Sequence, residues 1–169
     1  MAQESLLTSI PDNGNFLQQT KYTFTIPSLP FAKYFCQTVL MPGIATNEVL
    51  VPTPFADTYR HGDKLMYDAL TLTFLVDEDL RTWEDTYIWL ITLTNPFKFK
   101  QYANRFTEKY YDGYLEIKTN SNIPNIRVKF TNCHPTQLGA IQFDHTVTAD
   151  ITPICDMTIR YDQMVIERL

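Results

Sequence analysis

The chain has 169 residues, a formal net charge of −5, 14% aromatic residues and only 5 glycines. This length and composition predict one folded, β-rich domain and exclude a disordered chain. The negative charge disfavours general nucleic-acid binding, and three cysteines at unrelated spacings (Cys36, Cys133 and Cys155) indicate reduced thiols, not a disulfide framework.

Residues 1–19 are polar, contain a turn-prone Pro-Asp-Asn-Gly stretch, and are expected to form an arm that packs loosely on the domain. They lack the basic and apolar segments of a signal peptide. No window approaches the roughly 18 apolar residues of a membrane span. We therefore expect a single domain over 1–169, made in the cytoplasm and not placed in a membrane.

The first regular segment, residues 21–26, alternates apolar and polar side chains, which predicts a strand with Tyr22 and Phe24 facing inward. Residues 33–40 are interpreted as a second strand. The Met-Pro-Gly sequence that follows is typical of a turn, because proline fixes φ and glycine accepts unusual backbone geometry.

Residues 46–64 are the least regular long stretch. Pro52 and Pro54 exclude a central position in a sheet, and the polar sequence DTYRHGD favours turns. We interpret the whole stretch as a protruding hairpin or loop, and a loop of this length is usually functional. Our hypothesis is that it contacts neighbouring subunits through a set of residues along its length: Thr46, Val49, Val51, Pro52, Pro54, Phe55, Asp57, Tyr59 and Arg60.

The stretch 69–95 organises the chain. It opens as a strand with Leu70, Leu72 and Phe74 on one face, and an acidic turn at 77–79 follows. A helix is then predicted, beginning at Asp79 or Thr82 and ending before Pro96. Its apolar side chains recur at helical spacing, so we expect one face to pack on a sheet: Trp83, Tyr87, Leu90 and Ile91.

Residues 97–111 mix lysines and an arginine with aromatic residues. One interpretation is a nucleic-acid or partner-binding patch, because aromatic rings stack on bases and cations hold phosphates. The other is an irregular connection whose aromatic side chains cap the core. Glu108 and Asp112 dilute the positive charge, which favours the second interpretation.

Four further strands are predicted, at 114–119, 126–130, 141–143 and 154–166. In the last one Ile159 faces inward, and the alternation shifts phase by one residue before Met164. Such a shift indicates a bulge, or a strand that crosses from one sheet to another. About seven strands with no βαβ rhythm predict a mainly β fold, an antiparallel sandwich or barrel with one flanking α-helix.

The sequence offers little chemistry. His61, His134 and His145 are far apart and none stands at metal-ligand spacing. A nucleophilic pair of Cys133 and His145 has no specific support, and the nucleotide-binding and hydrolase motifs are missing. We therefore predict no catalytic residue, no metal and no cofactor, and not an enzyme. Sheet edges must nevertheless be hidden, which favours a subunit that closes its sheets against neighbours.

The order of several motifs resembles the tail tube protein family of contractile-tailed bacteriophages. These motifs are LMPGI at 40–44, HGDKLMYDALTLTFLVDEDL at 61–80, a helix with Trp89 and Leu90, and IRVKFTNCHPTQLGAIQFDHT at 126–146, followed by MTIRYDQMVI. The segment 135–141 stands where that family has a Pro-Thr-x-(Leu/Val)-Gly-x-(Ile/Leu) turn. The resemblance spans about residues 21–166.

The resemblance implies a structural virion protein whose hexameric rings stack into the inner tail tube, assembled in the host cytoplasm. It also implies a lumen lined by a shared β-barrel, through which genomic DNA passes, and sheath, tape-measure and baseplate partners. A charge of −5 per subunit gives about −30 per ring, which suits a wall that repels DNA. Two alternatives stay open: a tube initiator or other tube-like protein of the baseplate or tail end, and, from a different class, a nucleic-acid- or carbohydrate-binding module.

Overall fold

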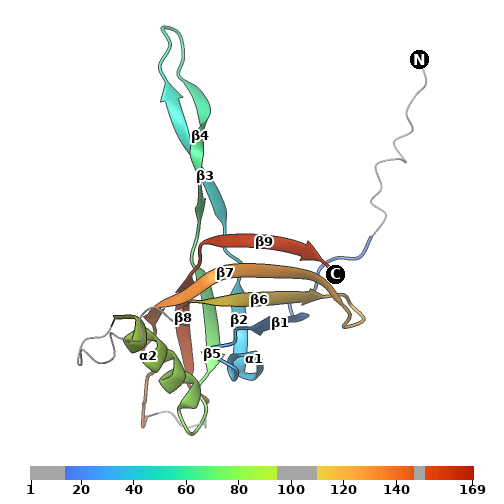
Figure 1. Ribbon diagram of the computed structural model, residues 1–169, viewed down its shortest axis with the longest axis vertical. Coiled ribbons are helices and arrows are strands. Elements are labelled where there is room, and N and C mark those ends of the chain that lie inside the picture. The colour runs from blue at the N-terminus through green and yellow to red at the C-terminus, as the bar shows by residue number, and fades with distance from the viewer. Residues whose placement is uncertain (1–13, 95–109, 147–150) are drawn as a thin grey trace.

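The computed structural model describes residues 14–94, 110–146 and 151–169. Nine strands and two helices occur in these ranges (Figure 1): β1 (Tyr22–Thr25), α1 (Ala32–Phe35), β2 (Cys36–Leu40), β3 (Ile44–Val51), β4 (Thr58–Tyr67), β5 (Leu70–Leu75), α2 (Arg81–Thr94), β6 (Tyr111–Lys118), β7 (Pro124–Leu138), β8 (Ile154–Arg160) and β9 (Gln163–Arg168). The predicted segment at 97–111 lies almost wholly outside the described residues.

Seven strands form one antiparallel network in the order β1-β6-β7-β8-β5-β2, with β9 also paired to β7. The long strand β7 belongs to two layers. Its first part pairs with β6 and β9, and its last residues, from His134 to Leu138, pair with β8. We call β1, β6, β9 and the first part of β7 layer 1, and β2, β5, β8 and residues 134–138 layer 2. The mainly β, antiparallel fold predicted from the sequence is confirmed.

The core lies between these layers, where inward-facing side chains of both form one buried apolar cluster. Phe24, Leu70, Leu72, Phe74 and Ile159 are all almost completely buried. Tyr22 is half-buried, and its hydroxyl donates a hydrogen bond to the Gln37 carbonyl across the seam between β1 and β2. Strands β1 and β2, the two ends of the strand order, lie on either side of this seam and do not pair with each other.

Two elements differ from the sequence-based expectation, and a third agrees with one of its two alternatives. Residues 32–35 form the helical turn α1 before β2 begins, and residues 141–143 are not a strand. The phase shift near Met164 marks a crossing between layers: β8 pairs with β5 in layer 2, and β9 pairs with β7 in layer 1. The Asp162 N–H donates to the Thr131 carbonyl at this crossing (3.0 Å).

Helix α2 meets the core through a face that only partly matches the predicted one, because Trp83 packs against the core but the fully buried positions are others. Thr82, Thr86 and Trp89 are its buried residues, Tyr87 is 44% exposed, and the other predicted positions, Trp83, Leu90 and Ile91, are only half-buried. Two small threonines let the helix lie close to its neighbours, and the Thr86 hydroxyl is satisfied by the Thr82 carbonyl (2.9 Å). Trp83 and Tyr87 instead stack on each other, with ring centroids 5.4 Å apart.

The start of α2 is set by Asp77. Its carboxylate accepts hydrogen bonds from the backbone N–H groups of Thr82 (3.1 Å) and Arg81 (3.2 Å), which have no partner inside the helix. Partial burial acts to raise the pKa of Asp77, but the hydrogen bonds from Thr82 and Arg81 outweigh it, so this pKa lies below its ordinary value. The predicted start at Asp79 or Thr82 is therefore only approximate.

Candidate interaction surfaces

Strands β3 and β4 pair only with each other and form a hairpin that projects from the body (Figure 1). The predicted protruding stretch 46–64 lies within it. Thr46, Val49 and Val51 are in β3, and Tyr59 and Arg60 are in β4. The proposed contact residues Pro52, Pro54, Phe55 and Asp57 form the tip, where the Phe55 side chain is completely exposed. The two prolines thus lie outside the paired parts of β3 and β4, because proline has no backbone N–H to donate to a strand partner.

Apolar side chains lie on both faces of this hairpin. The register pairs Leu50 with Tyr59 on one face and Val49 with Arg60 on the other. Several large apolar residues are exposed by about half or more: Ile44, Val49, Leu50, Tyr59, Leu65 and Met66. A lone two-stranded hairpin is marginally stable in water. Its exposed apolar surface is therefore suited to burial against a partner.

The hairpin base is tied to layer 2. The Asp68 N–H donates to the Gly43 carbonyl (3.0 Å), and Arg160 Nη1 of β8 donates to the Tyr67 carbonyl (3.2 Å). The Tyr67 ring packs against Tyr161, with centroids 5.7 Å apart. Burial raises the pKa of Tyr161 to about 12, and the neighbouring Tyr67 hydroxyl adds to the shift. These contacts fix the direction in which the hairpin leaves the body.

A bulge lies halfway along the hairpin, where the register shifts between Thr46 and Glu48. Gly62 stands opposite this bulge, and a Cβ atom at that position would lie 2.3 Å from the Asn47 carbonyl oxygen. Only glycine permits this approach of the two strands. The sequence analysis did not single out Gly62, although a glycine inside a strand-like pattern is a signal for a bulge.

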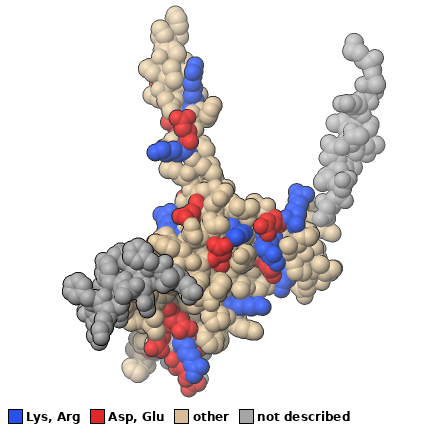
Figure 2. All heavy atoms as spheres, in the orientation of Figure 1, with Lys and Arg blue, Asp and Glu red and all other residues tan. Residues whose placement is uncertain are grey.

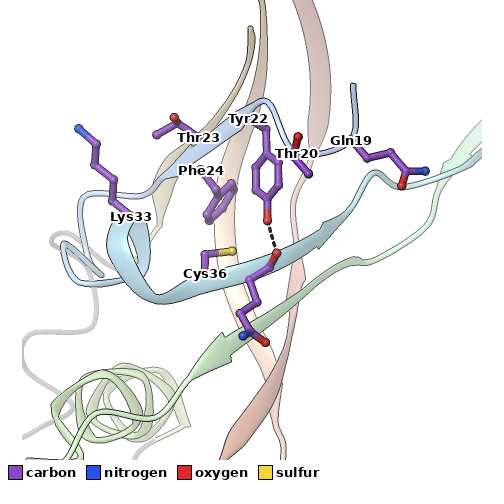
Figure 3. A pocket seen from close by; sticks show the side chains of 8 residues that line it. Gln19, Thr20, Tyr22, Thr23, Phe24, Lys33 and Cys36 are labelled. Atoms are coloured by element: carbon purple, nitrogen blue, oxygen red, sulfur yellow. Dashed lines mark hydrogen bonds between the residues drawn. The ribbon is translucent and has the colours of Figure 1, made fainter. Parts of the chain in front are cut away.

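The seam between β1 and β2 contains a hollow of about 330 Å³ (Figure 3). Tyr22 points across it from β1 towards β2, with Phe24 and Cys36 beside it. Burial raises the pKa of Cys36 to about 11, although the Tyr22 hydroxyl acts in the opposite direction. A thiol with this pKa is almost wholly protonated at neutral pH, which makes it a poor nucleophile.

The other candidate catalytic or metal-binding residues are not brought together into a site. Burial raises the pKa of Cys133 to about 11, and its Sγ contacts the Phe130 carbonyl (3.5 Å). His134 packs edge-on against Tyr110 at 5.4 Å between centroids. Within the described ranges, no three His, Cys, Asp or Glu side chains are grouped as metal ligands would be. Among the same residues, no helix is long and apolar enough to span a membrane.

The two outward sheet faces differ in charge. On layer 1, cross-strand ion pairs join Arg127 to Glu116 and Lys129 to Asp112, each at 2.8 Å. Figure 2 shows acidic and basic side chains interspersed over the visible face, without one large basic patch. The outward face of layer 2 mixes threonines with the apolar side chains of Leu40, Leu75 and Ile154. Its only formally charged side chains in the described strands are Asp156 and Arg160. This contrast was not visible in the sequence, since it depends on which strands pair.

Comparisons with known proteins agree with this architecture. No family model matches the chain. It is 26% identical over 160 residues to the "Tail tube terminator protein" of Enterobacteria phage T4, covering 91% of this chain and 90% of that one. Among solved structures, it is similar to the tube terminating cap of the anti-feeding prophage, with a TM-score of 0.67, 13% identity and coverage of 98% and 99%.

A second solved structure is a chain of the sheath-tube complex of PVC, an extracellular contractile injection system. It has a TM-score of 0.61 and 12% identity, with coverage of 92% of this chain and 94% of that chain. At this level of identity the two structures establish a shared fold. The resemblance predicted from the sequence is confirmed by the similarity to the T4 tail tube terminator, and the two solved structures agree with it in fold.

Proposed function

We propose that this protein is a structural subunit that forms a ring at the end of a contractile phage tail tube. The observation that carries the proposal is the similarity to the T4 tail tube terminator over about nine-tenths of both chains. The 0.67 TM-score to a tube terminating cap supports the same role. The tube-end alternative thus replaces the main tube subunit as the favoured interpretation.

The proposed ring contains six copies of the chain, as the family resemblance implies. Layer 2 supports ring formation because both of its edges lack a strand partner among the described residues. Strand β2 pairs only with β5, and residues 134–138 of β7 pair only with β8. Exposed edges with unpaired N–H and C=O groups invite pairing with another chain. A head-to-tail contact between two different edges closes into a ring when the rotation permits.

The hairpin is the surface proposed to contact the adjoining ring of the tube. Its exposed apolar side chains lie at Val49, Leu50, Phe55 and Tyr59, well away from the core between the two layers. Burying such side chains stabilises a complex by about 25 cal/mol for each Å² of apolar surface removed from water. The hairpin is therefore proposed to bind the adjoining ring of the tube. The sheath, tape-measure and baseplate proteins are further proposed partners, because the family resemblance implies them.

No enzymatic activity forms part of the proposal. The relatives carry names of structural tail proteins, and the pKa values of Cys36, Cys133 and Cys155 are all raised, chiefly by burial. The proposed location is the tail of the virion, after assembly in the host cytoplasm.

Negative-stain electron microscopy of the purified protein over a range of concentrations tests the proposal. Single rings that do not lengthen into tubes are the expected result. Long hollow tubes would instead identify a main tube subunit. This is the second candidate function, because the chain is also similar to a chain of a sheath-tube complex. Monomers that retain DNA at low salt would support a nucleic-acid-binding module.

A further inference from the structure

The last strand, β9, is an edge of layer 1. Among the described residues it pairs with β7 and has no strand on its other side. The Leu169 N–H donates to the Asn125 carbonyl (2.9 Å), so in this antiparallel register the odd-numbered residues of β9 exchange backbone hydrogen bonds with β7. The N–H and C=O groups of the even-numbered residues, Met164, Ile166 and Arg168, therefore point to the free edge. A further strand can pair with them.

The apolar row that crosses layer 1 is uncovered where it reaches β9. Cross-strand pairing joins four inward-facing residues in this row: Phe24, Leu115, Val128 and Ile166. The first three belong to the core and are at most 4% exposed, whereas Ile166 is 57% exposed. Val165, on the opposite face of β9, is 37% exposed. A strand added at this edge would therefore gain apolar contacts on both faces as well as backbone hydrogen bonds.

The N-terminal arm leaves the body near this edge and on the side of β2. Phe16 and Leu17 line a hollow of about 160 Å³ together with Asn125, whose carbonyl also accepts the hydrogen bond from Leu169 at the end of β9. Residues 19–20 border the seam hollow beside β2 (Figure 3), the edge proposed to pair with the next copy. Phe16 is 90% exposed and Leu17 is 68% exposed, so their own body does not cover them.

The sequence of residues 5–10, Ser-Leu-Leu-Thr-Ser-Ile, suits the free edge of β9. In an extended segment these side chains alternate, with Leu6, Thr8 and Ile10 on one face and Leu7 on the other. One face can cover Ile166, and Leu7 can pack beside Val165. The segment has the same length as β9, which has 6 residues. The turn-prone sequence at 11–14 joins it to the root of the arm.

We propose that residues 5–10 of one copy add as an antiparallel strand to the free edge of β9 in the adjacent copy of the ring. This inference rests on the proposed ring and adds a second contact between neighbouring copies. Figure 1 shows β9 running towards the side of the body from which the arm leaves. Around a ring, the end of β9 in one copy therefore faces the beginning of β9 in the next. An arm that continues across this boundary meets the next β9 in the antiparallel direction.

Paired cysteines test both the occupant of the edge and its direction. S5C/R168C places one thiol at the start of the arm segment and one at the end of β9. S5C/Q163C is the matched control, with the second thiol at the other end of β9, about 17 Å away. Rings of each variant are treated with a short bis-maleimide and run on a denaturing gel. The unmodified protein sets the background, which should be low because Cys133 and Cys155 are buried and burial raises the pKa of Cys36 to about 11.

Rings of S5C/R168C should give a ladder of covalently joined copies, and rings of S5C/Q163C should give single chains. A ladder from S5C/Q163C instead would overturn the antiparallel addition. Cross-links within single chains, identified from their proteolytic peptides, would show that the arm covers β9 of its own copy. Rings without cross-links in either variant would exclude β9 as the site of the arm. A failure of the unmodified protein to form rings would overturn the proposed function, and this contact with it.

Hydrogen exchange tests the backbone pairing. In rings of the unmodified protein, the Ile166 amide should exchange about ten-fold more slowly than in rings of T8P. Proline at position 8 has no N–H to donate and disrupts a paired strand. T8A keeps the N–H and should keep the protection. The Val165 amide bonds to β7 and should exchange alike in all three proteins. Equal exchange of the Ile166 amide in T8P and T8A rings would contradict the proposal.

Discussion

Arg160, on β8, donates a hydrogen bond from Nη1 to the carbonyl oxygen of Tyr67, the last residue of β4, at 3.2 Å. This bond joins the projecting hairpin to the sheet whose edges are proposed to close the ring. Through it, the direction of the hairpin depends on the position of layer 2.

Replacing this arginine should loosen the hairpin without unfolding the domain. R160A removes one exposed hydrogen bond, so the free energy of unfolding should fall by about 1.5 kcal/mol or less. Hydrogen exchange should become faster at the base of β3 and β4 and remain unchanged in β5 and β7. R168A removes the same charge from exposed β9 and serves as the control. Equal exchange in the two variants would show that the Arg160 bond does not hold the hairpin.

Gly62 should be essential for the shape of the hairpin. G62A places a Cβ atom 2.3 Å from the Asn47 carbonyl oxygen, so the two strands must separate at the bulge. We expect faster proteolytic cleavage between residues 44 and 67 and loss of contact with the tube, with thermal unfolding of the body unchanged. G14A is the matched control, because no atom lies within 4 Å of the added methyl group.

The two faces of α2 should differ in their contribution to stability. Trp89 is buried and meets Tyr111 edge-on at 5.6 Å between centroids, so W89A should cost about 3–5 kcal/mol of unfolding free energy. Tyr87 is 44% exposed and stacks on Trp83, so Y87A should cost about 1 kcal/mol or less. Urea unfolding measures both values. A larger loss of unfolding free energy for Y87A than for W89A would show that α2 packs through the face predicted from the sequence.

The cap at Asp77 should make stability depend on pH at the acidic end. The folded-state pKa of Asp77 is lowered, so its contribution is complete above the unfolded-state pKa of about 4 and is lost as the pH falls through the folded value. At pH 7, D77A should lower the free energy of unfolding by about 1 kcal/mol. The difference between D77A and the unmodified protein should shrink below about pH 4. A constant difference down to pH 2 would show that the charged carboxylate is not the cap.

Removing the hairpin tip should separate ring formation from attachment to the tube. A deletion from Pro52 to Arg60 removes the exposed Phe55 and Tyr59 but none of the residues of layers 1 and 2. The variant should still form rings and should fail to bind tube ends in a co-sedimentation assay. Unimpaired binding would exclude the hairpin as the contact with the adjoining ring.

Local patterns predicted much of the fold. The alternation in β5 identified Leu70, Leu72 and Phe74 because a half-buried strand repeats every two residues. The buried positions of α2 were not predicted because they include Thr82 and Thr86, which do not stand out by hydrophobicity, although the predicted Trp83 does pack against the core. The length of β7 was missed because Asn132, with φ of 54°, interrupts its alternation.

The candidate interaction surfaces were harder to predict from the sequence than the strands were. The prolines at 52 and 54 predicted the projecting stretch, since proline is excluded from central strands. The composition of the outward face of layer 2 was not predictable, because that face exists only after β5 and β8 pair and set Thr73 beside Asp156, 83 positions further along the chain. Likewise, the free edges follow from the complete strand order.

The position of the protein along an assembled tail tests the tube-end role most directly. A gold label attached to a cysteine on the outward face of layer 1, at T23C, can be located on tails by electron microscopy. A ring at the end of the tube predicts label at one end of each tail and none along its length. Label distributed along the whole tube would contradict the account and identify the main tube subunit.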